Sequence, residues 1–167
     1  SENTVEVAEY MDIHKYDVVI PSKVRINSKE YSVTGIADSV FYGRKDMTSI
    51  EISSSVTSIG NSAFEGCSGL TSIEILSGVT SIGNSAFEGC SGLTSIKIPS
   101  SVTSIGEFAF SGCSGLTSIE IPYSVTSIED WAFRNCQNAD IVIDNSEEDV
   151  TIVRDAFANC KSVTWKW

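Results

Sequence analysis

Histidine is almost absent from this chain, since His14 is the single imidazole among 167 residues. Serine is abundant, but nucleophilic catalysis needs a base beside the nucleophile, and most serines lie far along the sequence from His14. The nucleotide-binding and hydrolase signatures GxGxxG, GxxxxGK[ST] and GxSxG are also missing. We therefore expect a protein that is not an enzyme, with no catalytic residue and no cofactor.

Basic residues are scarce as well, with 11 Lys and Arg against 22 Asp and Glu, a net charge of -11 and a pI near 4.4. Such a chain repels phosphate backbones, which argues against nucleic acid as a partner. No apolar run approaches the roughly 18 residues of a membrane span. The sequence begins at Ser1 without a charged and apolar leader, and we expect that a signal peptide has been removed.

What the chain does contain is an internal repeat of 23 residues, once 24. One unit, at 70–92, reads "LTSIEILSGVTSIGNSAFEGCSG", and the next, at 93–115, reads "LTSIKIPSSVTSIGEFAFSGCSG". A period near 23 is typical of leucine-rich solenoids, in which each unit is one coil. Every unit has a phenylalanine at the same position, and most have a cysteine at a second position: Phe41, Phe64, Phe87, Phe110, Phe133 and Phe157, with Cys67, Cys90, Cys113, Cys136 and Cys160.

The pattern inside one unit predicts which side chains face the core. In "LTSIEI" we expect Leu70, Ile73 and Ile75 to point inward, while Ser72 and Glu74 alternate with them and point outward. The apolar side chains of one coil cannot be buried by that coil alone. Burial therefore requires stacking, at about 4.8 Å per coil.

The rest of the unit predicts corners and a second short strand. "PSS" at 99–101 turns the chain, and "VTSI" then directs Val102 and Ile105 inward. We expect "NSAF" at 61–64 to form a single helical turn capped by Asn61. Glycines in "GCSG" then close the coil.

These features predict a β-rich solenoid, a right-handed superhelix of about six 23-residue coils with short strands and one helical turn each. We expect residues 1–32 to form N-terminal capping strands and residues 33–167 to form the solenoid, within a single domain. "VTWKW" at 163–167 should form a last strand whose tryptophans cover or extend the core.

The consensus "LTSIxIPxSVTSIGxxAFxGCSG" resembles the repeat of BspA-like bacterial surface proteins, also called the Treponema pallidum type of leucine-rich repeat. The resemblance covers about 34–167, and the segment "VVIPSKVRINSKEYSVTGIADSVF" is similar to the opening of such proteins. It implies a leucine-rich repeat fold at a bacterial cell surface. It also implies binding, because some members bind host proteins such as fibronectin and fibrinogen. The family has no shared catalytic residue.

The cysteines are expected to be structural. Zinc sites need closely spaced cysteines or histidines, and here no two cysteines are closer than 23 residues. Stacked neighbours point the same way and their number is odd, which argues against disulfides. We predict a column of buried free thiols and no metal site, with a redox or metal role as the alternative.

One outward column is a candidate binding face, because solenoids bind through such extended surfaces. The alternative is a surface that serves only solubility. The column consists of Glu51, Glu74, Lys97 and Glu120, beside Ser49, Ser72, Ser95 and Ser118.

Aromatic residues form a second candidate. The position two before the repeated phenylalanine holds Ser39, Ser62 and Ser85, then Phe108 and Trp131, then Asp155. Tyr123 similarly replaces serine at a turn. Exposed aromatic side chains often anchor partners. Alternatively, these rings pack over a widening gap near the C-terminal end.

The acidic run "DNSEEDV" at 144–150 could hold calcium, but it lacks the DxDxDG spacing, which favours a solvated loop. Taken together, the residues and the resemblance predict a noncatalytic, adhesin-like module outside the cell or at its surface. It would contact host matrix proteins or glycans. The alternative is a structural spacer that presents another domain.

Overall fold

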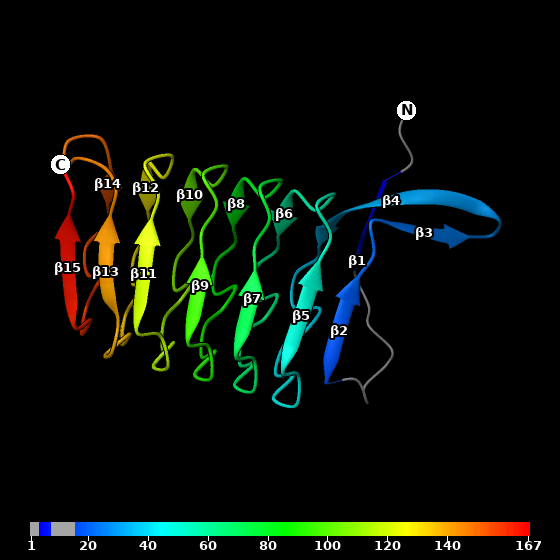
Figure 1. Ribbon diagram of the computed structural model, residues 1–167, viewed down its shortest axis with the longest axis horizontal. Helices are drawn as coiled ribbons and strands as arrows, with labels where there is room; N and C mark the ends of the chain where they lie inside the picture. The colour runs from blue at the N-terminus through cyan, green and yellow to red at the C-terminus, as the bar shows by residue number, and fades with distance from the viewer. Residues whose placement is uncertain (1–3, 8–15) are drawn as a thin grey trace.

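The computed structural model describes residues 4–7 and 16–167 of the chain. Successive coils lie side by side in a row, and from one coil to the next the strands are parallel (Figure 1). Each coil contributes one strand to each of two sheets. The predicted β-rich leucine-rich solenoid of about six coils is confirmed.

The first sheet, sheet B, faces the viewer in Figure 1 and runs from one end of the molecule to the other. Its neighbours keep matching repeat positions in line, for example Ser72 with Ser95 and Glu74 with Lys97. Its seven strands, in spatial order, are β2 (Asp17–Ile20), β5 (Ser49–Ile52), β7 (Ser72–Glu74), β9 (Ser95–Lys97), β11 (Ser118–Ile121), β13 (Asp140–Ile143) and β15 (Ser162–Trp165).

The second sheet, sheet A, lies behind sheet B and is built mostly from two-residue strands. Its N-terminal part is longer and includes an antiparallel hairpin of β3 with β4. Its strands are β1 (Thr4–Val7), β3 (Lys23–Ile26), β4 (Lys29–Ile36), β6 (Ser58–Ile59), β8 (Ser81–Ile82), β10 (Ser104–Ile105), β12 (Ser127–Ile128) and β14 (Thr151–Ile152).

The core fills the space between the sheets and repeats coil after coil. Leu70, Ile73 and Ile75 are buried, as are Val102 and Ile105, so the expected inward positions do face the core. Between them, the serine and glutamate of β7 and β11 stay outside. Strand alternation therefore decides which side chains reach the core, because a pleated strand directs successive side chains to opposite faces.

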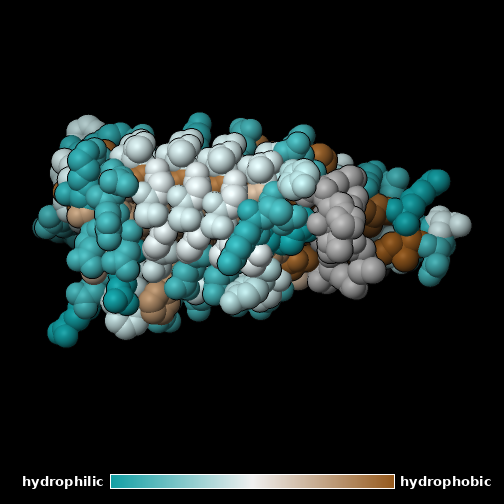
Figure 2. Space-filling model, turned by 90° about the horizontal axis from the view of Figure 1, so that it is seen from below, coloured by the Kyte–Doolittle hydropathy of each residue, from teal (hydrophilic) through white to brown (hydrophobic). Residues whose placement is uncertain are grey.

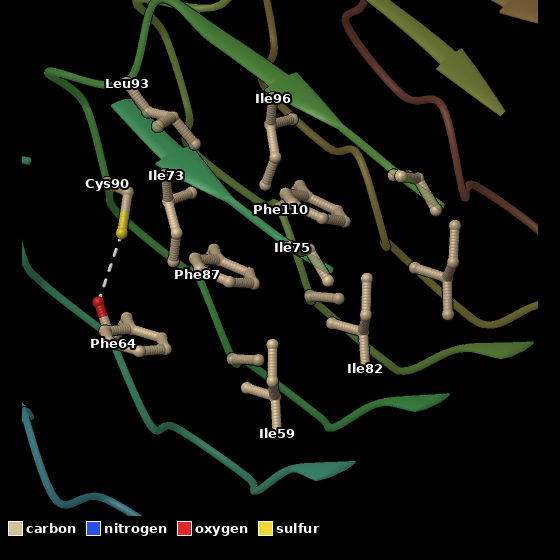
Figure 3. Close-up of a cluster of buried hydrophobic side chains, with 14 of the residues drawn as sticks. Ile59, Phe64, Ile73, Ile75, Ile82, Phe87, Cys90, Leu93, Ile96 and Phe110 are labelled. Atoms are coloured by element: carbon tan, nitrogen blue, oxygen red, sulfur yellow. Dashed lines mark hydrogen bonds between the residues drawn. The ribbon is translucent and has the colours of Figure 1, made fainter. Parts of the chain in front are cut away.

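The six repeated phenylalanines form one continuous stack inside this core. Their ring centroids are 5.3, 5.2, 5.3, 5.1 and 5.5 Å apart along the chain, with interplanar angles of 14° or less. Figure 3 shows Phe64, Phe87 and Phe110 in this arrangement. Neighbouring phenylalanine rings are therefore slightly more than 5 Å apart on this side of the core.

The third side of each coil contains no helix within the described residues, which corrects the prediction of a helical turn at "NSAF". Ser62 and Gly66 have φ of 53° and 72°, in the left-handed region, and such residues interrupt a right-handed helix. The amides of Ser62, Phe64 and Gly66 donate to carbonyls of the next coil at 2.7–2.8 Å. The amides of Glu65 and Cys67 donate to Ser62 and Phe64 of the same coil in separate turns, so no continuous helix forms.

Asn61 likewise does not cap a turn of its own coil. Its Oδ1 accepts a hydrogen bond from the Asn84 amide of the following coil at 2.8 Å. The Asn84 side chain in turn accepts from the Glu107 amide at 3.0 Å, and Asp38 accepts from the Asn61 amide at 2.7 Å. These side chains form a ladder that ties four coils together.

The last glycine of "GCSG" is required by a close approach. A Cβ at Gly92 would lie 2.4 Å from the carbonyl oxygen of Ser68 in the preceding coil, and one at Gly69 would lie 2.2 Å from that of Lys45. Any larger residue would force adjacent coils apart. Glycine therefore allows the close approach of the backbones at these two coils, whereas the equivalent position two coils after Gly92 is Asn138.

The two ends depart from the regular coil. Residues 16–31 hold β2, β3 and the start of β4, and β4 crosses position 32, where we placed the end of the cap, so that division remains a prediction. At the other end, β15 is the expected last strand. Trp165 packs against the core, while Trp167 is 83% exposed and donates its indole N–H to Asp144.

Candidate functional site

The outer face of sheet B displays two straight columns of side chains. The register of the strands places Asp17, Ser49, Ser72, Ser95, Ser118, Asp140 and Ser162 in one column. The second column, two residues further along each strand, contains Val19, Glu51, Glu74, Lys97, Glu120, Val142 and Thr164. The predicted charged column therefore exists as one line of neighbours, and a valine stands at each end of it.

Three hollows lie along this face. One of about 520 Å³ is lined by residues that include Lys97, Glu120 and Tyr123, and a second of about 460 Å³ includes Glu51 and Glu74. A third, of about 310 Å³, lies between Glu74 and Lys97. The serine side chains of the first column are small, so the face is indented beside the charged column.

The charges of the column differ in their pairing. Glu120 is bonded to the ammonium of Lys166, which also lies 3.6 Å from Asp144, and the bond to Glu120 raises the pKa of Lys166. No ion pair links Glu51, Glu74 or Lys97 to another described residue. The three free charges thus lie side by side in the order acidic, acidic, basic.

Tyr123 lines the hollow of about 520 Å³. Its side chain is 67% exposed, and its backbone carbonyl accepts a hydrogen bond from Asn145 at 3.0 Å. Asp144 lines the same hollow, although the sequence pattern did not point to it. Its place could have been inferred, because the strand before it, β13, aligns with β11 and so brings Asp144 next to the turn that holds Tyr123.

Phe108 and Trp131 lie elsewhere, after the short strands of sheet A, and neither lines any of the three hollows. Their rings contact each other with centroids 4.9 Å apart, and the guanidinium of Arg134 lies 5.7 Å from the Trp131 centroid. Both side chains are half-buried. The structure therefore brings these two aromatics together but keeps them apart from Tyr123.

The cysteine column is closed to solvent along most of its length. Cys67, Cys90, Cys113 and Cys136 are fully buried free thiols, and Cys160 is half-buried. Each Sγ donates to the carbonyl of a phenylalanine in an earlier coil, as Cys90 does to Phe64 at 3.1 Å (Figure 3). Burial raises the pKa of Cys67 and of Cys113 to about 12. Neutral, inaccessible thiols have no nucleophilic chemistry to offer.

Other potential sites add nothing to this picture. In residues 4–7 and 16–167, no three His, Cys, Asp or Glu side chains cluster as metal ligands would. In the 144–150 loop, the Asp144 carboxylate accepts from Trp167 and Asp149 accepts from Ser146. His14 lies outside the described residues. The described residues include no helix that is long and apolar enough to cross a membrane.

The side of the solenoid seen in Figure 2 is mostly pale over the middle coils, between more hydrophilic ends. This appearance is expected where a repeat presents serine, threonine and glycine. Compared with it, the outer face of sheet B combines indentation, charge and an exposed aromatic ring. It is the strongest candidate site on the molecule.

Comparison with known proteins places the chain in a family. The model of the BspA type leucine rich repeat region matches residues 34–164 in six copies. A leucine-rich cell surface protein of Faecalibacterium prausnitzii is 30% identical with a TM-score of 0.69, and the match covers 96% of this chain and 50% of that one. The leucine-rich repeat protein of T. pallidum is 29% identical with a TM-score of 0.71, over 90% and 72% of the two chains.

The pneumococcal vaccine antigen PcpA is also similar, with 25% identity and a TM-score of 0.53 over 80% of this chain and 41% of that one. No curated protein matches. This chain spans about half the length of the F. prausnitzii protein. The repeat, the two-sheet coil and these matches agree, and the chain belongs to the BspA-type leucine-rich repeat family.

Proposed function

We propose that this chain is a noncatalytic protein-binding module, displayed outside the cell or at its surface, and that it binds through the outer face of sheet B. The observation that carries the proposal is the row of three hollows beside the unpaired charges of Glu51, Glu74 and Lys97. Charges that have no partner in the protein can steer a complementary partner onto this face and fix its register. Tyr123 supplies an exposed aromatic anchor at one end.

The class of partner follows from charge and from the family. With a net charge of -11, the chain attracts positively charged surfaces. Its similarity to a leucine-rich cell surface protein supports an extracellular setting, where host matrix proteins and glycans are available. An adhesin-like contact with such molecules is therefore our leading proposal for the biological role.

A binding screen tests this proposal. The chain would be measured by surface plasmon resonance against a panel of matrix proteins and glycans, together with Glu74→Lys and Lys97→Glu. We expect at least one partner with a Kd in the micromolar range or below, and a loss of about tenfold or more in the variants. Glu65→Lys, which makes the same charge change on the turn side, should bind like the unmodified chain.

The aromatic pair offers a competing site in the same screen. Phe108→Ser and Trp131→Ser restore the residue that earlier coils have, so they should not disturb the fold. If these variants lose binding while Glu74→Lys does not, the site is the aromatic pair and not sheet B. If no panel member binds the unmodified chain, the proposed function is wrong.

The second candidate function is a structural spacer. The uninterrupted phenylalanine stack supports it, because a continuous core makes a stiff rod. The complete gene discriminates between the two functions. An adhesive or catalytic domain attached to the solenoid would favour the spacer.

A further inference from the structure

The charged column of sheet B has a fixed pitch that selects the conformation of what it binds. The column residues are register partners on neighbouring parallel strands, and such strands lie about 4.8 Å apart. Each coil places one side chain in the column, so the charges repeat at about this spacing. A partner that pairs with every coil must present one side chain per step of the same length.

Among regular peptide conformations, the α-helix matches this step. A helix rises about 5.4 Å per turn, so side chains at i, i+4, i+7 and i+11 form a row with nearly the pitch of the coils. Side chains on one face of a strand repeat at about 6.6 Å and would drift by roughly 9 Å over five coils, against roughly 3 Å for the helix. A polyproline helix repeats at about 9.3 Å, close to two coils, so one row of its side chains would meet only every second charge of the column.

The width of the face also suits a helix. The strands β7 and β9 have three residues each, so the flat part of the face is about 10 Å wide. A helix with its side chains is about 10–12 Å across. The small serines next to the charged column leave room for the flank of such a helix, in the hollows of about 520 and 460 Å³.

The order of side chains in the column specifies the sequence of the partner. Val19, 60% exposed, begins the column, and half-buried Val142 lies five coil steps along it, before Thr164 of the last strand. Glu51, Glu74 and Lys97 follow Val19, and none of them forms an ion pair with another described residue. Glu120 comes next and forms an ion pair with Lys166. The complementary row therefore reads apolar, basic, basic, acidic, neutral, apolar.

We infer that the outer face of sheet B binds an amphipathic α-helix of a partner protein, about 18 residues long and aligned with the solenoid axis. The helix carries basic side chains opposite Glu51 and Glu74, an acidic one opposite Lys97, and apolar ones opposite Val19 and Val142. Five coil steps of about 4.8 Å span roughly 24 Å and five helical turns about 27 Å, a difference that the long side chains of lysine and glutamate can take up. The inference rests on the proposed function and adds the conformation and charge order of the ligand.

A designed peptide tests the inference on the whole chain. It would carry Leu, Lys, Lys, Glu, Gln and Leu at i, i+4, i+7, i+11, i+14 and i+18, with alanine and glutamine elsewhere. Fluorescence anisotropy at about 50 mM salt, where exposed ion pairs are weakly screened, would give its Kd. The control peptide has the same composition with these residues placed at every second position.

We expect the helical row to bind at least about fivefold more tightly than the control, which is the scale of a few exposed ion pairs. Lys97→Glu should weaken the peptide, and exchanging its Glu at i+11 for Lys should restore binding to that variant. Equal binding of the two peptides, or no restoration by the exchange, would overturn the inference. A third outcome separates the two proposals. If Glu74→Lys abolishes binding of a protein from the panel, but the peptide does not compete with that protein for the unmodified chain, the helical ligand is wrong and the proposed function stands.

Discussion

The residue two positions before each stacked phenylalanine has a left-handed backbone in every coil from Ser39 to Asp155, with φ between 53° and 64°. Serine tolerates this conformation better than bulky residues do, and a large side chain there costs of the order of 1 kcal/mol or more. Phe108 and Trp131 occupy it nevertheless, with φ of 56° and 54°. Contact between the two rings, at 4.9 Å, offsets part of this cost.

The buried thiols predict how stability depends on pH. A thiol with an ordinary pKa of 9.0 loses its proton above pH 9 in the unfolded chain, whereas the folded chain holds the pKa of Cys67 and Cys113 at about 12. Because the folded pKa is raised, the stabilisation is complete below pH 9 and is lost as the pH rises toward 12. We expect each thiol to lower the free energy of unfolding by up to about 1.4 kcal/mol per pH unit in this range.

Urea unfolding at pH 8, 9, 10 and 11 measures this slope. The double variant Cys67→Ala, Cys113→Ala should show a shallower decline than the unmodified chain, by up to roughly 2.7 kcal/mol per pH unit. The double variant Val79→Ala, Val125→Ala is the control, since it removes two buried side chains that do not titrate. Identical slopes in the double variant and the unmodified chain would contradict the prediction.

At the scale of elements, the coils are joined by three kinds of ladder. Two are the parallel strand pairings of sheets A and B. The third runs along the turn side, where Asp38, Asn61 and Asn84 each accept a backbone amide from the next coil. In a turn that lacks helical hydrogen bonds, these side chains satisfy amides that would otherwise have no protein partner.

The side-chain ladder can be tested where it ends. Asn84→Ala removes the acceptor of the Glu107 amide and should lower the free energy of unfolding by about 1 kcal/mol. Glu107→Ala is the matched control. No hydrogen bond links the Glu107 side chain to another described residue, so this change should have little effect. Chemical denaturation of both variants gives the comparison, and equal losses would contradict a role for the ladder.

On the scale of the whole molecule, stability arises from contacts between neighbouring coils. Each coil buries its apolar residues only against the next, as the phenylalanine stack and the parallel register show. Solenoids of this kind behave as a sum of repeats and interfaces. The molecule therefore has no single centre on which folding depends, and its length can change in units of one coil.

Deletion of residues 70–92 tests this modularity, because it removes one complete repeat and joins equivalent positions. We expect a folded protein with the same type of far-UV circular dichroism spectrum and a lower free energy of unfolding, since one interface is lost. The contrasting deletion of residues 70–81 joins unlike positions of the coil. It should unfold the protein, and a shortened chain that folds equally well in both cases would contradict the modular account.

The period of the repeat, the columns of inward side chains and the last strand at 163–167 could all be predicted from the amino-acid sequence. Those features depend on alternation along a strand and on the 23-residue repeat, both of which are properties of the chain read alone. The charged column from Glu51 to Glu120 could be predicted for the same reason. Its extension to Val19 and Val142 was missed, because the strands that hold them lie outside the regular repeat.

The contacts between neighbouring coils could not be predicted from the sequence and are known only from the tertiary structure. The sign of φ at Ser62 and Gly66, the ladder from Asp38 to Glu107 and the pairing of Lys166 with Glu120 all depend on where a neighbouring coil places its atoms. A local pattern such as "NSAF" is compatible with a helical turn, yet the carbonyls of the next coil offer its amides better partners. Hydrogen bonds between coils prevail because they recur along the whole stack, and they also set the pitch at which the outer face presents its charges.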